Sequence, residues 1–164
     1  MGSEETQRLR AVALASLNYE AETGILRWKI ARAHRLRVGD IAGSRCKIHG
    51  YIKVHLEHRG FFAHRLIWLM LHGDWPEHVI DHINGRRDDN RLSNLRCATR
   101  QQNAMNGRRR KRSGLKGAFW LPRQKVWHAR ICRQYLGSFD TEQEAHAAYM
   151  SAARAQFGEF ARAG

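Results

Sequence analysis

The segment Asp81-His82-Ile83-Asn84-Gly85 constrains this chain more than any other. It follows the β-branched pair Val79 and Ile80 with a carboxylate next to an imidazole, and Asn84-Gly85 is a strong turn signal. Alternation along a strand sends Asp81 and His82 to opposite faces, so both can serve one site only at the strand end, where the backbone turns. The pattern therefore predicts a short strand, Val79 to His82, that delivers two reactive side chains to a turn.

Two amides extend this pattern. Asn94 and Asn103 follow His82 by 12 and 21 residues, within an otherwise apolar pattern. Carboxylate and amide oxygens suit a hard divalent cation, and an imidazole with a pKa near neutrality suits activation of water. The net charge of +14, from 29 Lys and Arg against 15 Asp and Glu, favours a nucleic-acid partner. Together these residues predict a one-metal phosphodiesterase site.

Composition excludes several other classes of protein. Hydrophobic content of 43% indicates a folded chain, and the longest apolar run, near Leu66 to Leu71, is too short to cross a membrane. The polar, acidic N-terminus does not resemble a secretory signal. Cys46, Cys97 and Cys132 are far apart in sequence, so we expect neither a disulfide framework nor a structural zinc. Reduced thiols and a cytoplasmic location are the expectation.

A run of five consecutive cations, bounded by Asn106-Gly107 and Ser113-Gly114, divides the chain. Like charges repel in a packed core, so residues 107–113 read as a solvated linker between domains at 1–106 and 114–164. Arg108, Arg109 and Arg110 in this linker either lie along a phosphate backbone or form an exposed hinge. Of the net +14, +8 falls in residues 107–164.

Periodicity and apolar density predict these elements in the first half: a helix near Gln7–Leu17, strands at 25–30 and 51–56, a buried helix beginning near Ala63, and a strand over Leu92–Cys97. Thr99 and Gln102 form a capping-box signature, which places Asn103 in the first turns of a helix. Strand, loop, strand and helix thus follow one another around the polar residues.

This half resembles the HNH nucleases, in particular those of phages and mobile elements, over roughly residues 19 to 106. The pieces that carry the likeness, in order, are Gly50-Tyr51, Ala63-His64-Arg65-Leu66, Gly73-Asp74-Trp75-Pro76, Asp81-His82-Ile83-Asn84-Gly85, Asp89-Asn90-Arg91, Asn94-Leu95-Arg96 and Gln102-Asn103. The resemblance implies a ββα-metal fold and hydrolysis of DNA phosphodiester bonds.

The resemblance also implies roles for individual residues. His82 would be the general base, and Asn94 would brace the loop between the strands and orient His82. Asp81 and Asn103 would hold one Mg²⁺ or Mn²⁺ ion. From the residues alone, Arg86 and Arg87 could contact phosphates or be solvated, and His64 could cap and pack a helix or assist the site.

The second half reads as three strands, at Leu115–Leu121, Val126–Cys132 and Tyr135–Phe139, and a helix. Thr141 and Glu144 form a capping box that opens this helix, and Gly158 ends it. The half resembles the plant APETALA2/ethylene-response-factor (ERF) DNA-binding domain over roughly residues 113 to 162. The residues that carry the likeness are Gly114-Leu115, Trp127-His-Ala129-Arg-Ile131, Tyr135-Leu136-Gly137-Ser-Phe139, Glu144-Ala145, Ala148-Tyr149, Ala152-Ala153 and Gly158-Glu-Phe160-Ala161.

That family reads the major groove with its sheet, and the matching positions here are Lys116, Arg130, Arg133 and Tyr135. Ala118 and Cys132 fall where the plant proteins usually have Arg, so fewer base contacts are expected.

The sequence therefore predicts an α+β protein: a ββα-metal nuclease domain, then a small three-stranded antiparallel sheet packed on one helix. The predicted function is a metal-dependent, homing-endonuclease-like DNA endonuclease that nicks or cleaves double-stranded DNA as a monomer or a transient dimer on DNA, with no organic cofactor and no membrane partner. The alternatives are a DNA-binding regulator with an inactive HNH scaffold, and a basic RNA-binding protein.

Overall fold

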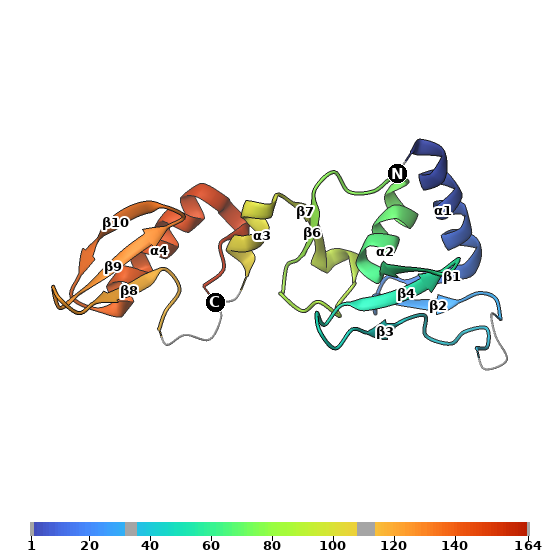
Figure 1. Ribbon diagram of the computed structural model, residues 1–164, viewed down its shortest axis with the longest axis horizontal. Coiled ribbons are helices and arrows are strands. Elements are labelled where there is room, and N and C mark those ends of the chain that lie inside the picture. Colours follow the sequence, from blue (N-terminus) through green and yellow to red (C-terminus); the bar gives the residue numbers. More distant parts are fainter. Residues whose placement is uncertain (1, 32–35, 108–113, 164) are drawn as a thin grey trace. The chain divides into compact units, whose positions relative to one another are not determined.

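The computed structural model describes residues 2–31, 36–107 and 114–163. Figure 1 shows a mixed α/β protein built from helices and several small antiparallel sheets. The chain divides into two compact units, Met1–Ala98 and Thr99–Gly164, a boundary that lies earlier than the predicted linker. Arg108, Arg109 and Arg110, with most of that linker, lie outside the described residues.

The first unit carries the following elements: α1 (Ser3–Ser16), β1 (Leu17–Glu20) paired with β2 (Ile25–Trp28), a three-stranded sheet of β3 (Ser44–Arg45), β4 (Ile52–Leu56) and β5 (Arg59–Phe62), α2 (Ala63–His72), β6 (Val79–His82), the 3-10 turn η1 (Leu92–Asn94), and β7 (Leu95–Ala98). The predicted helices and strands near residues 7, 25, 51 and 63 are present, with α1 beginning earlier than expected. Strands β1, β3 and β5 were not predicted.

Helix α2 lies at the centre of the first core. Leu66 and Ile67 are fully buried and pack with Val54 of β4 and Ala13 of α1. Helical spacing brings such apolar side chains onto one face, and their burial supplies most of the stability of a helix this short. This core anchors the β6–β7 hairpin, because Ile80 and Leu95 belong to the same cluster.

Strands β6 and β7 pair antiparallel, with Asp81 opposite Arg96 and His82 opposite Leu95. The bounds of β6 are the predicted ones. The predicted strand over Leu92–Cys97 is wrong at its start: Leu92–Asn94 form a 3-10 turn, closed by the hydrogen bond from Asn94 N to Arg91 O at 2.9 Å. The short turn interrupts the ladder, so β7 begins only at Leu95.

The second unit contains the following elements: α3 (Arg100–Asn106), β8 (Ala118–Leu121), β9 (Val126–Ile131), β10 (Gln134–Phe139), α4 (Glu142–Phe157) and the 3-10 turn η2 (Gly158–Phe160). The three strands form an antiparallel sheet in the order β10-β9-β8 that packs on α4. Both predicted capping boxes are present, at Thr99 and Thr141, and Gly158 ends α4 as predicted. Residues Leu115–Gly117, predicted as strand, instead precede β8 as a turn.

Small residues let α4 lie close on the sheet. Ala118, Ala129 and Ala145 are buried against one another. Gly117 adopts φ +82°, and a Cβ there would lie 2.0 Å from the Tyr149 ring. Only glycine fits so close an approach in a left-handed backbone conformation.

The short helix α3 packs within the second unit. Lys116 Nζ donates to the carbonyl oxygens of Met105, Gly107 and Arg162, and the Tyr149 hydroxyl donates to the Met105 sulfur. In the part of the chain that the structure describes, no helix combines the length and apolar composition needed to span a bilayer.

Candidate active site

Asp81 and His82 are both buried at the end of β6, each with 4% of its surface exposed, and they face different partners. Alternation along the strand, noted from the sequence, accounts for the difference. The turn that follows is closed by the hydrogen bond from Gly85 N to His82 O at 2.7 Å. Its loop, residues 83–94, carries most of the remaining polar side chains of the site.

Asp81 forms an ion pair with the residue opposite it in the hairpin. Arg96 Nε donates to Asp81 Oδ2 at 2.9 Å, and both side chains are nearly buried. Removing one member of such a pair leaves the other charge uncompensated in a poorly solvated site. Arg96 belongs to the motif Asn94-Leu95-Arg96, but its sequence position predicts no role, because only the register of the hairpin places it opposite Asp81.

His82 is held on one side by an amide. Its Nε2 lies 3.2 Å from Oδ1 of Asn90, which is 2% exposed. An amide oxygen can only accept, so the tautomer that suits this contact carries its hydrogen on Nε2. Burial lowers the pKa of His82, opposed by the Asn90 hydrogen bond and by the charges of Asp81 and Asp89. The imidazole is therefore neutral near neutral pH, as a general base must be.

Aromatic rings enclose the other sides of His82. The His64 ring lies edge-on to it with centroids 5.1 Å apart, and the Tyr51 ring lies at 5.8 Å. His64 is buried in the first turn of α2 and stacks on Phe62. Burial, aided by the His82 and Arg65 charges, lowers the pKa of His64 to about 3. Both roles considered for His64 from the sequence remain compatible with this placement.

Asn94 holds the loop. Its Nδ2 donates to Asp89 O at 2.8 Å, and its Oδ1 accepts from Asn84 N at 2.9 Å. These bonds tie the two ends of the loop together. Asn90, which is not among the predicted site residues, makes the hydrogen bond with His82 Nε2.

Asp89 connects the loop internally. Its carboxylate accepts from Arg91 Nε at 2.8 Å and from Asn84 Nδ2 at 2.7 Å. The Arg91 guanidinium, with the Asn84 hydrogen bond, holds the pKa of Asp89 at about 2. The carboxylate therefore stays ionised, and the loop keeps its shape, over the whole physiological range.

The β1–β2 hairpin packs against the 83–94 loop and holds its backbone. The Tyr19 hydroxyl donates to Asn90 O at 3.1 Å and accepts from Leu92 N at 2.8 Å. Gly24, at φ +74°, approaches so closely that a Cβ there would lie 2.4 Å from Arg91 N. Residues some seventy positions apart thus fix the backbone of Asn90.

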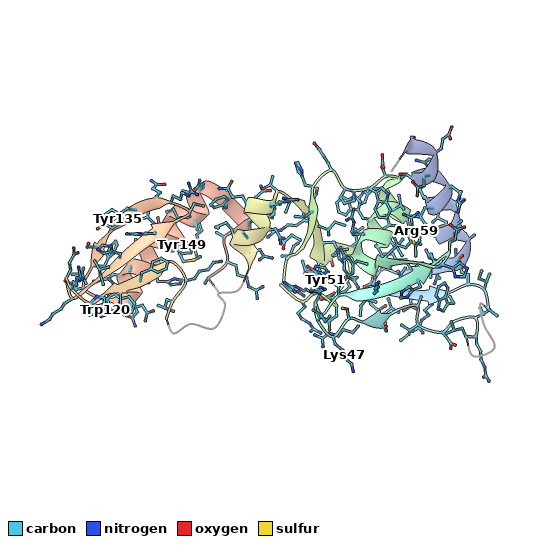
Figure 2. All side chains as sticks on the ribbon, in the orientation of Figure 1. Lys47, Tyr51, Arg59, Trp120, Tyr135 and Tyr149 are labelled. Atoms are coloured by element: carbon cyan, nitrogen blue, oxygen red, sulfur yellow. The ribbon has the colours of Figure 1, made fainter. Side chains whose placement is uncertain are left out.

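The predicted DNA contacts differ in their surroundings. Arg86 and Arg87 are exposed on the 83–94 loop, and Arg87 lies 5.0 Å over the Tyr51 ring. In the second unit, Arg130, Arg133 and Tyr135 are exposed at the sheet and its β9–β10 turn; Figure 2 shows Tyr135 there. Lys116, by contrast, is occupied by three backbone carbonyls, because its partly buried ammonium needs acceptors.

Asn103 is exposed on α3, within the second unit, while Asp81, His82 and Asn94 belong to the first. Its participation with Asp81 in one metal site stays a prediction.

Comparison with known proteins matches part of this region. Residues 61–105 fit the family model described as HNH endonuclease. The chain is 34% identical over 71 residues to Protein 3.8 of Escherichia phage T7, a stretch that covers 42% of this chain and 59% of that protein. The chain thus spans about three fifths of the length of this relative. No solved structure matches the chain.

The matched segment begins just before α2 and includes His64, Asp81, His82 and the loop asparagines Asn84, Asn90 and Asn94. It indicates a nuclease-type function directed at DNA for this part of the chain. It ends before β8, so the ERF-type likeness of residues 114–164 stays a prediction.

Proposed function

We propose that the protein is a metal-dependent DNA endonuclease of the phage or mobile-element HNH type, with His82 as its general base. The observation that carries this proposal is the environment of His82. It is a buried, neutral imidazole at a strand end, oriented by Asn90 and contained in the segment that matches HNH endonucleases.

His82 would take a proton from the attacking water through Nδ1. The hydrogen bond from Nε2 to Asn90 fixes the tautomer that leaves Nδ1 unprotonated. It also stabilises the imidazolium that forms when the proton arrives. Asn90 would therefore act as a positioning residue, and Asn94 would act one step further away, by holding the loop that carries Asn90.

Asp81 and Asn103 would hold a single Mg²⁺ or Mn²⁺ ion. Magnesium in phosphoryl-transfer sites is commonly bound by one or two carboxylates, with waters and substrate phosphate completing its shell. A carboxylate and an amide oxygen are hard oxygen donors of the kind that this mode uses. The ion, when bound, would polarise the scissile phosphate and stabilise the leaving oxygen.

Binding energy would come from cations on both units. Arg86 and Arg87 would contact phosphates close to the scissile bond. Arg130, Arg133 and Tyr135 would contact duplex DNA from the β8–β10 side as an ERF-type module, and Arg108, Arg109 and Arg110 would contact phosphates. Lys116 is omitted from this set because its ammonium is already bonded within the second unit.

Nicking of supercoiled plasmid, with Mg²⁺ or with EDTA, tests the proposal. We expect Mg²⁺-dependent nicking, and a rate about 10²–10⁴-fold lower for His82→Ala at nearly unchanged DNA affinity. His78→Ala removes an exposed histidine just before β6 and serves as the matched control. Equal nicking by His82→Ala would refute its role as base. DNA binding without nicking by the unmodified protein would instead support a regulator with an inactive scaffold.

A further inference from the structure

The turn between β3 and β4, residues 46–50, carries an unusual side chain at its tip. Ile48 is 84% exposed, more than the other large apolar residues that the structure describes as exposed. One exposed isoleucine on a protein surface means little by itself. The turn that carries Ile48, however, is rigid, cationic and attached to the candidate active site.

Hydrogen bonds fix the turn. Gly50 N donates to Cys46 O at 2.7 Å, and Cys46 N donates to Tyr51 O at 2.8 Å. Hydrogen bonding from the backbone N–H groups of His49 and Ile48 lowers the pKa of the Cys46 thiol. The turn therefore holds Ile48 outward without ordering a flexible loop on binding, which would reduce affinity.

Arg87 attaches this turn to the candidate site. Its Nη1 donates to His49 O at 2.9 Å, and its guanidinium lies 5.0 Å over the Tyr51 ring. Tyr51, which directly follows the turn, contacts the ring of His82. Ile48 and His82 are thus held by one connected set of side chains within the first unit.

Cations surround the tip. The side chains of Arg45 and Arg86 are 68% and 69% exposed, and both lie 3.7 Å from the Asp88 carboxylate, a loose contact. Lys47, next to Ile48, extends away from the unit (Figure 2). Such cations beside an apolar tip match a partner with an anionic surface and an apolar interior. The connection of the turn to His82 through Arg87 and Tyr51 favours duplex DNA, rather than an anionic lipid, as that partner.

We propose that residues 46–50 form a wedge for duplex DNA: Ile48 inserts at a base step from the minor groove, and Arg45 and Lys47 bind the flanking phosphates. Apolar side chains used in this way partly unstack the step and kink the duplex. The link through Arg87 and Tyr51 sets the distance from the kink to His82. The inference rests on the proposed function, because it assigns the wedge to the DNA that the site cuts.

Unwinding of DNA tests the wedge without cleavage. Closed circular plasmid is relaxed by a metal-independent topoisomerase in EDTA with the full-length protein bound, and the change in linking number is read after the protein is removed. We expect unwinding by the unmodified protein, and at least about twofold less unwinding per bound molecule for Ile48→Ser. Val38→Ser, at another exposed apolar position of the first unit, is the matched control and should unwind normally.

Ile48→Phe keeps an insertable apolar side chain and should retain unwinding. Unwinding by Ile48→Ser equal to that of the unmodified protein overturns the wedge, as does an absence of unwinding by all forms. Parallel nicking with Mg²⁺ separates the two proposals. Nicking without Ile48-dependent unwinding refutes the wedge alone, whereas Ile48-dependent unwinding without nicking refutes the nuclease alone.

Discussion

Two buried histidines meet at this site, and their hydrogen bonding differs. His82 has Asn90 as a partner, whereas the Nδ1 atom of His64 is buried without a hydrogen-bond partner in the described part of the chain. A buried imidazole without an acceptor or a counter-charge strongly disfavours protonation. The neutral ring of His64 therefore packs against His82. Its burial also makes the fold less stable in acid.

Stability should fall with acidification because of His64. Its folded pKa of about 3 lies below its ordinary 6.5, so below about pH 6.5 the unfolded chain binds a proton that the native protein excludes. The resulting loss begins near pH 6.5 and grows until about pH 3. The free energy of unfolding, measured in urea, should fall between about pH 7 and pH 5 for both proteins. We expect the fall to be roughly 2 kcal/mol smaller for His64→Phe than for the unmodified protein.

Asp89 titrates in a different window and does not confuse this measurement. Its folded pKa of about 2 lies below its ordinary 3.8, so its contribution is present above about pH 3.8 and is lost only as the pH falls toward 2. An identical pH dependence for His64→Phe and the unmodified protein above pH 4 would show that His64 is not buried in neutral form.

Among the secondary-structure elements, the β1–β2 hairpin supports the loop that orients His82, although the two are far apart in the sequence. Tyr19 and Gly24 contact the backbone of Asn90 and Arg91, so the hairpin sets the position of the amide that orients His82. A substitution in this hairpin should therefore change the rate of DNA cleavage although the hairpin contacts none of the reacting atoms.

Gly24→Ala should lower the nicking rate by about tenfold or more, because its Cβ would push on the 83–94 loop. Gly39→Ala is the control: Gly39 also has a positive φ, at +89°, but a Cβ there meets nothing within 4 Å. Both variants share the backbone strain, so a difference in rate, measured with stability followed by thermal unfolding, isolates the contact with the loop. Equal nicking rates for the two variants would show that the position of the hairpin against the loop does not affect activity.

Sequence patterns predicted those elements whose signals are local. The strand Val79–His82 and the caps at Thr99, Thr141 and Gly158 depend on neighbours within a few residues, and the structure has them as predicted. The contact of Asn90 with His82 could not be predicted in this way, because it depends on a loop fixed by Tyr19 from another hairpin. The surroundings of Lys116 could not be predicted either, because its ammonium donates to carbonyl oxygens of α3 and of the C-terminal segment, which are distant in sequence.

For the whole molecule, charge on the second unit should control how binding responds to salt. Truncation after Asn106 would remove Lys116 and Tyr149, which hold α3 through Met105, so substitutions test the idea more cleanly. Each phosphate contact contributes about 0.9 to the slope of log K against log salt, so Arg130→Ala with Arg133→Ala should make it shallower by about 2.

Arg154→Ala is the control for that measurement, because Arg154 is exposed on α4, the helix that covers the other side of the sheet. Duplex binding across a salt series gives the slopes. The sheet is not the DNA-binding face if the slope is unchanged in the Arg130 and Arg133 double variant. The same conclusion follows if Arg154→Ala changes the slope equally.

The close approach of α4 to its sheet has a calorimetric consequence. Alanines and a glycine fill one part of that contact and a small cluster with Ile131, Tyr149 and Met150 fills the other, whereas leucine, isoleucine and tryptophan fill the larger core of the first unit. The heat-capacity increment of unfolding follows the apolar surface exposed, so the second unit should fall below the usual ~12–15 cal/mol/K per residue. Scanning calorimetry should resolve two transitions, with the smaller increment for the second unit. That unit's stability should vary little with temperature and persist in the cold, where the larger apolar core of the first unit weakens.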